Sequence, residues 1–131
     1  MNATSPSLWS EPLTRDECQR RLEVADVARV LISLRGLPAA LSARIEHVAP
    51  DHIVFSSREN AVLLAARRGD VVSVQIDGLD NDANTWSVNV TGIVGTIPPD
   101  EVTTERFKRI VNGGATLAVL PLSIVSGQRE H

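Results

Sequence analysis

Residues 70–97 read DVVSVQIDGLDNDANTWSVNVTGIVGTI, and this stretch decides the fold. The apolar side chains of its two halves occupy alternate positions: Val72, Val74 and Ile76, then Trp86, Val88 and Val90. Alternation with a period of two among β-branched residues is typical of half-buried strands, whereas a helix would spread these residues around its circumference. The turn-forming residues 78–84 between the halves favour a hairpin. We therefore expect an antiparallel β core.

Length and composition are those of one globular domain: 131 residues, 43% hydrophobic and 22% charged. A net charge of −3 without a basic stripe argues against a nucleic-acid partner. No apolar run approaches the roughly 20 residues that a membrane span needs, and the N-terminal sequence has no signal-peptide pattern. The single cysteine, Cys18, excludes an internal disulfide. These features predict a cytoplasmic protein without nucleic-acid or membrane partners.

The chain divides into a flexible N-terminal arm (1–12), one domain (13–127) and a polar tail (128–131). Three short helices are expected, at residues 13–25, 59–69 and 100–114. In the first of them, Thr14 and Glu17 have the spacing of a capping box. Six strands are expected, at residues 27–34, 40–48, 52–57, 71–77, 86–92 and 115–127. Six strands with three helices at the edges predict a mainly β protein in which the sheet closes into a barrel.

Several motifs follow one another in a distinctive order: LTRDECQRRL (13–22), ARVLISLRGLP (28–38), HIVFSS (52–57), LLAARRGDVVSVQID (63–77), TWSVNVTG (85–92) and IVSG (124–127). In this order, from about Leu13 to Gly127, the chain resembles the pyridoxamine 5′-phosphate oxidase-like family of FMN-binding split barrels. Bacterial members have a small residue followed by arginine on the first strand, present here as Ala28-Arg29. They also have Gly-Trp-Ser-Val, which reads Thr85-Trp86-Ser87-Val88 here.

The resemblance implies a six-stranded antiparallel split β-barrel with three peripheral helices, paired as a homodimer, with FMN in a groove between the two barrels. In relatives, hydroxyl and basic residues at the end of the third strand and in the next helix hold the flavin phosphate. Relatives read Phe-Arg-Thr at this strand end, whereas this chain reads Phe55-Ser56-Ser57, and Val62 stands where relatives place a lysine. A flavin phosphate prefers cations, hydroxyls and helix N-termini, so these departures weaken the site.

The candidate cofactor-binding residues are Ser57, Arg58, Arg44, Trp86 and Arg29. The resemblance assigns Ser57 to the phosphate and Trp86 to the border of the flavin ring. Arg58 and Arg44 lie beside the altered motif and could supply the missing charge. Trp86 could equally be a packing residue, and Arg29 an ordinary exposed strand residue.

Two functions remain open. The first is a flavin-dependent oxidoreductase that acts on a small molecule, since a cofactor can carry redox chemistry without catalytic side chains. The second is a split-barrel dimer that has lost the flavin and serves as a ligand-binding or interaction module. The ligand could be FMN, a deazaflavin or another small molecule, and the sequence identifies no catalytic residue. Asp80, Asp82 and Asn84 have calcium-loop spacing, but Thr85 and Thr91 break the motif, so no metal site is expected.

Dimerisation is also expected from the distribution of apolar residues. Only 3% of the residues are aromatic, so aliphatic side chains must fill the barrel. We expect Leu31, Ser33, Val72 and Val74 to face the interior. Ile93, Ile97 and residues 117–125 are then left outside, where a second subunit would cover them.

Overall fold

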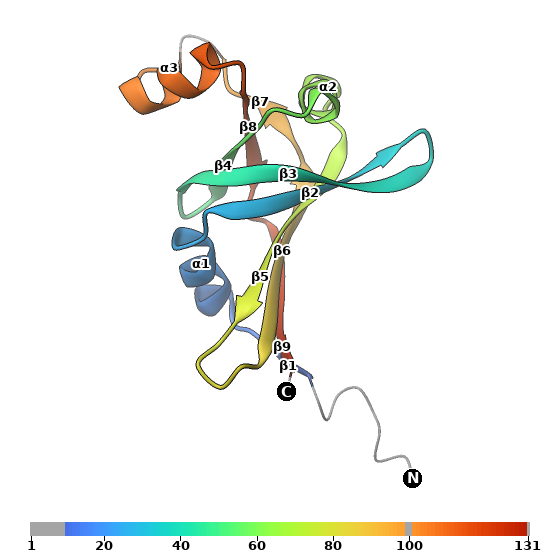
Figure 1. The fold of residues 1–131 in the computed structure, drawn as a ribbon, viewed down its shortest axis with the longest axis vertical. Coiled ribbons are helices and arrows are strands. Elements are labelled where there is room, and N and C mark those ends of the chain that lie inside the picture. The colour runs from blue at the N-terminus through green and yellow to red at the C-terminus, as the bar shows by residue number, and fades with distance from the viewer. Residues whose placement is uncertain (1–9, 99–100, 131) are drawn as a thin grey trace.

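The computed structural model describes residues 10–98 and 101–130 (Figure 1). The strands described are β1 (Ser10–Pro12), β2 (Val27–Leu34), β3 (Leu37–Val48), β4 (His52–Ser57), β5 (Val71–Leu79), β6 (Thr85–Ile93), β7 (Gly95–Thr96), β8 (Thr116–Pro121) and β9 (Ile124–Glu130). The helices described are α1 (Arg15–Glu23), α2 (Asn60–Arg68) and α3 (Glu105–Asn112). No helix among these residues is long and apolar enough to cross a membrane.

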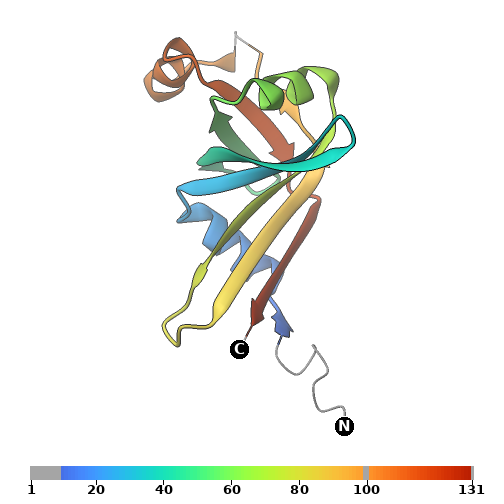
Figure 2. The same ribbon diagram turned by 45° about the vertical axis from the view of Figure 1, so that its right-hand side comes forward.

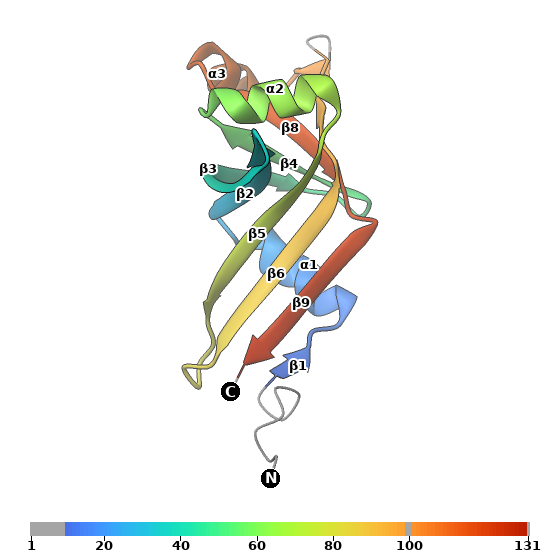
Figure 3. The same cartoon turned by 90° about the vertical axis from the view of Figure 1, so that its right-hand side faces the viewer.

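All nine strands belong to one antiparallel sheet with the order β1-β9-β6-β5-β2-β3-β4-β8-β7. The chain passes from β6 through Val94 directly into β7, so one bent segment pairs with β5 and β9 at one end and with β8 at the other. β6 and β7 are far apart in the strand order, and the bend joins them directly. The sheet therefore curls into a split barrel (Figures 1 and 3). The predicted mainly β architecture with three helices is therefore confirmed.

The predicted number of six strands is wrong, because the described residues form nine. The expected strand at 115–127 is divided into β8 and β9 by a turn at residues 122–123, and β7 follows β6 as a separate short strand. β1 is also additional: Ser10 lies opposite Glu130 in β9. Pairing between the two ends of the chain is a long-range contact that leaves no periodic signal in either segment.

These pairings also change the description of the predicted arm and tail. Residues 10–12 of the arm and residues 128–130 of the tail are strands. Residues 1–9 and 131 lie outside the described residues.

The barrel interior is filled by alternating aliphatic residues, as the hairpin pattern predicts. Val72, Val74, Ile76, Val88 and Val90 are all buried. The core also takes in Phe55, Ile53, Leu120 and Val94 from other strands. Aliphatic packing of this kind supplies most of the stability of a domain with so few aromatic residues.

The predicted orientation of β2 is wrong. Its buried residues are Ala28, Val30 and Ile32, whereas Leu31 is half-buried and Ser33 is exposed. Leu31 and Ser33 share a face with the charged Arg29, and burying that guanidinium would be costly, so this face turns outward. Because almost every residue of β2 is apolar, its alternation alone is ambiguous.

Residues 117–125 also differ from the prediction, which placed this run outside the barrel. Leu117, Leu120 and Leu122 are buried, and only Ile124 of the large residues is strongly exposed, at 63%. The turn at residues 122–123 separates a buried β8 from an exposed start of β9.

Helix α1 begins at the predicted capping box. The Thr14 hydroxyl accepts a hydrogen bond from the Glu17 amide, and the Glu17 carboxylate accepts one from the Thr14 amide. This arrangement orients the helix so that Cys18 and Leu22 pack against the barrel. Burial raises the pKa of the Cys18 thiol, with a further contribution from the charge of Glu17, so the thiol remains neutral and packs as a small apolar group.

Gly127 in β9 lies where α1 packs closely against the sheet. A Cβ atom at this position would lie 2.7 Å from Cys18 Sγ and 3.1 Å from the Ser87 carbonyl oxygen. We expect Gly127→Ala to lower the free energy of unfolding by about 1–3 kcal/mol, because α1 would be displaced. The matched control is Gly92→Ala, whose nearest neighbour would be at an ordinary 3.6 Å. Equal denaturation midpoints for the two variants would contradict this interpretation.

Candidate functional site

A cavity of about 340 Å³ lies between the outer face of the β3–β4 pair and α3. Its lining consists of Ser42, Ala43, Arg44, Glu46, Ser56, Ser57, Arg58, Glu59, Ile110 and Ala115. Three of the five candidate cofactor-binding residues, Arg44, Ser57 and Arg58, therefore meet at one cavity. This is the end of β4 where the sequence predicts binding of a phosphate.

The Ser57 hydroxyl is already engaged by the backbone. Ser57 is 4% exposed, and its Oγ donates to the Ser42 carbonyl oxygen at 2.8 Å. The same oxygen accepts a hydrogen bond from the Glu59 amide at 3.2 Å. These two bonds connect β4 to β3 and to the start of α2, so the hydroxyl has a structural role as well as a place at the cavity.

The two arginines of the cavity differ in their partners. Arg58 Nη1 donates to the Gly113 carbonyl oxygen at 2.7 Å, which places a cation at the C-terminal end of α3. The side chain of Arg44 makes no hydrogen bond or ion pair with any other residue that the structure describes. Arg44 therefore offers a complete guanidinium to a ligand, and Arg58 offers the donors that Gly113 leaves.

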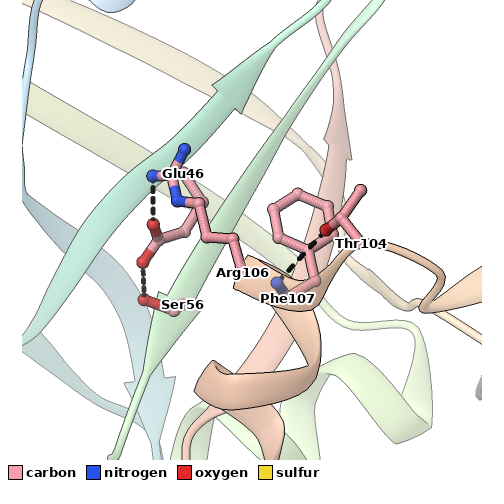
Figure 4. A network of polar contacts seen from close by, with 5 residues as sticks. All are labelled: Glu46, Ser56, Thr104, Arg106 and Phe107. Atoms are coloured by element: carbon pink, nitrogen blue, oxygen red, sulfur yellow. Dashed lines mark hydrogen bonds and ion pairs between the residues drawn. The ribbon is translucent and has the colours of Figure 1, made fainter.

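Three further residues form a polar network at the same cavity (Figure 4). The carboxylate of Glu46 accepts a hydrogen bond from the Ser56 hydroxyl at 2.6 Å and pairs with Arg106 of α3 at 2.6 Å. The Glu46 side chain is 8% exposed, whereas that of Arg106 is 58% exposed. The network connects β3, β4 and α3, and it holds a helix that has no fully buried residue of its own.

Val62 does not line this cavity. It is 1% exposed and belongs to the hydrophobic core cluster. The position that the resemblance assigns to a lysine therefore contributes packing here and no charge.

The structure does not bring Trp86 into the cavity. Trp86 is the second residue of β6 and pairs with Gly78 beside the β5–β6 loop, which lies at the opposite end of the molecule from α2 and α3 (Figure 3). The Arg21 guanidinium lies 4.5 Å from the centre of the indole ring, and the ring also covers Gly78. In this chain Trp86 is thus a packing residue of the hairpin with a cation–π partner.

Arg29 lies beside the cavity without lining it. It is exposed on β2 and directly opposite Ser42 in β3, which does line the cavity. Residues opposite each other on neighbouring strands lie within side-chain reach, so the guanidinium can approach the cavity from its β2 side.

The acidic loop at residues 80–84 is a structural turn. The Asp80 carboxylate accepts hydrogen bonds from the Asp82 and Asn84 amides and pairs with Arg129 at 3.1 Å. Burial acts to raise the pKa of Asp80, but the amides and Arg129 outweigh it and lower the pKa overall. Among the residues described, no group of three or more histidine, cysteine, aspartate or glutamate side chains is placed to hold a metal.

Comparison with known proteins identifies the family. Residues 14–121 match the pyridoxamine 5′-phosphate oxidase family. The chain belongs to the pyridoxamine 5′-phosphate oxidase family. The uncharacterized protein Rv0080 of Mycobacterium tuberculosis is 31% identical to this chain over 115 residues, a region that covers 82% of this chain and 73% of that protein.

Solved structures share the fold of this family member. An FAD-binding protein of Mesorhizobium loti has a TM-score of 0.73 at 18% identity, with 93% of this chain and 99% of that chain covered. An FAD-binding protein of Mycobacterium smegmatis has a TM-score of 0.69 at 20% identity, with the same coverage of 93% and 99%. Likenesses at such low identity show a shared fold.

The charged pair beside the cavity, Glu46 and Arg106, is absent from the sequence-based candidates; Glu46 lines the cavity, and Arg106 pairs with it. Glu46 is an outward residue of β3, so strand alternation could have placed it on the same face as Arg44. Arg106 reaches Glu46 only because α3 packs beside β3 and β4, and the pairing spans sixty positions. No local pattern could have indicated that contact.

We expect Arg106→Ala to lower the free energy of unfolding by about 1–3 kcal/mol, because it leaves the buried Glu46 carboxylate without its counter-charge. Chemical denaturation would measure the loss. Arg109→Ala is the matched control, since Arg109 is exposed on the same helix and its side chain contacts no charged partner among the described residues. In a Glu46→Gln background the cost of Arg106→Ala should shrink, and an unchanged cost would refute the ion-pair explanation.

Proposed function

We propose that this member of the pyridoxamine 5′-phosphate oxidase family is a flavin-binding oxidoreductase that acts on a small molecule and takes FMN as its cofactor. The observation that carries the proposal is the meeting of Arg44, Ser57 and Arg58 at one cavity. Family membership and the fold shared with two FAD-binding proteins support a flavin ligand. Bound flavin would supply the electron or hydride transfer, and the protein would supply binding and orientation.

The cavity suits the anionic end of a flavin mainly through its guanidinium groups. All the N–H donors of the Arg44 guanidinium are available to a ligand. Arg58 uses one N–H group to bind the Gly113 carbonyl oxygen, and its other N–H groups remain available. Arginine binds phosphate oxygens in a bidentate manner, which can replace the hydroxyl contacts that Ser57 gives to the backbone. Arg29 would extend the positive surface from β2, and the flavin ring would lie outside the cavity, against the barrel.

Homodimerisation is part of the proposal, because the outer face of the sheet carries unpaired apolar side chains. Val71 and Ile93 face each other across β5 and β6 and are 66% and 63% exposed. Beside them is a broad concavity lined by the β2–β3 hairpin, β5 and Thr91 of β6, including Leu31 and Pro38. A second subunit would bury this face and create the groove for the flavin ring.

A ligand-binding module without flavin is the second candidate function, and one observation favours it. The Ser56 and Ser57 hydroxyls are both committed to partners within the chain, and Val62 is buried. Such a protein would keep the dimeric barrel and bind another anionic or apolar molecule in the groove.

Flavin titration separates the two functions. We expect added FMN to bind with quenching of its fluorescence, and Arg44→Ala and Arg58→Ala each to weaken binding by roughly tenfold, since each removes a charge-assisted contact. Arg20→Ala is the control, because Arg20 is exposed on α1 and does not line the cavity. Absence of any FMN binding would favour the module without flavin.

Light scattering tests the dimer. We expect a dimer mass for the native chain and a monomer mass for Ile93→Asp at the same concentration, because a carboxylate at the centre of the apolar face would be buried unpaired. Val24→Asp is the control, since Val24 is 83% exposed at the end of α1 and away from the sheet. A monomer mass for the native chain at every concentration would exclude the dimer.

A further inference from the structure

A carboxylate of the chain itself lines the cavity that the proposed function assigns to an anion. Glu46 lines this cavity, and its side chain is 92% shielded from solvent. One carboxylate oxygen accepts a hydrogen bond from the Ser56 hydroxyl and the other pairs with Arg106, both at 2.6 Å. A hydroxyl and a guanidinium that converge on two oxygens are the same donors that bind a phosphate group.

The local geometry of β3 explains how Glu46 comes to lie there. The pairing between β3 and β4 shifts register between Ile45 and His47, which leaves Glu46 without a partner residue in β4. Such a bulge redirects a side chain, and bulges are frequent beside binding sites. Here the Glu46 side chain, which stands at the bulge without a residue opposite it, points to Ser56 and Arg106 (Figure 4).

The barrel itself has little need of this charge. A buried carboxylate is stable only when it is paired and hydrogen-bonded, and replacement of such a pair by neutral groups is often neutral for stability. A glutamine could keep both contacts, since its amide oxygen accepts from Arg106 and its NH₂ group donates to the Ser56 hydroxyl. The stability of the barrel therefore does not explain why this residue is charged, and we look for the explanation in the binding of a ligand.

We propose that Glu46 is an internal competitor of the ligand phosphate and that it sets the specificity of the cavity. This inference rests on the proposed function. A phosphate monoester that enters the cavity meets the Glu46 charge and finds Ser56 and Arg106 already bound to it. FMN is consequently held loosely, because the Glu46 charge offsets the attraction that Arg44 and Arg58 exert on the phosphate, and on balance the phosphate adds little to the affinity of the flavin. The cavity thus favours a flavin that exchanges readily over one that stays permanently bound.

FMN and riboflavin differ only in the phosphate, so paired titrations of the purified full-length chain test the proposal. The measurement is the dissociation constant of each flavin, from quenching of flavin fluorescence. For the native chain we expect the two constants to agree within about threefold. For Glu46→Gln we expect FMN to bind roughly tenfold more tightly, with riboflavin changed by less than about twofold.

Glu59→Gln is the matched control, because Glu59 lines the same cavity but is exposed to solvent, where its charge is screened. It should change the FMN constant by less than about threefold. Ser56→Ala adds a second test: it should remove part of the FMN gain in the Glu46→Gln background, where the Ser56 hydroxyl accepts from the glutamine amide and can donate its proton to phosphate, and it should have little effect on FMN in the native background.

The outcomes separate this inference from the function on which it rests. A native chain that binds FMN more than about tenfold tighter than riboflavin overturns the role of Glu46 and leaves flavin binding intact, even if Glu46→Gln does not fold. Equal shifts of both flavins in Glu46→Gln, or weaker FMN binding, overturn it as well, since Glu46 would then position Arg106. Failure of every variant to bind either flavin overturns the proposed function together with the inference.

Discussion

The bend between β6 and β7 is the constraint on which the rest of the molecule depends. Val94 is fully buried at this bend, and its amide donates to the Asp70 carbonyl oxygen at 3.0 Å. Because the chain turns there, one continuous segment pairs with β5 and β9 and then with β8. The barrel closes around its aliphatic core, and β4 is held between β3 and β8 (Figure 2). The cavity beside β4 therefore has walls that belong to a fixed sheet.

Sequence reasoning succeeds where the signal is local. The β5–β6 hairpin, the capping box at Thr14 and the three helices all follow from periodicity, capping and turn chemistry within a few residues. It fails where the answer depends on distant partners. The pairing of β1 with β9 and the division of the last predicted strand both depend on how the barrel closes. The face of β2 was misassigned because apolar residues stand on both sides of that strand.

The same distinction applies to the site. Arg44, Ser57 and Arg58 line one cavity because β3 and β4 are neighbours along the chain, and their role in binding a cofactor stays a prediction. Trp86 belongs to the other end of the barrel, where its ring packs on Gly78 and Arg21. Arg106 could not be inferred, because α3 is positioned by tertiary packing against β8 and by its polar contacts with β3 and β4.

The attachment of α3 connects stability to binding. Its apolar residues are at most half-buried, so the helix depends on Arg106 bound to Glu46 and on Arg58 bound to the Gly113 carbonyl. Both arginines are also the donors that an anion in the cavity would seek. A ligand that recruits them must therefore compete with the contacts that hold α3, and each gain in ligand binding is offset by a loss within the protein. An anion site built in this way would bind weakly and release its ligand readily, even though two arginines and three serines line it and Arg106 lies beside it.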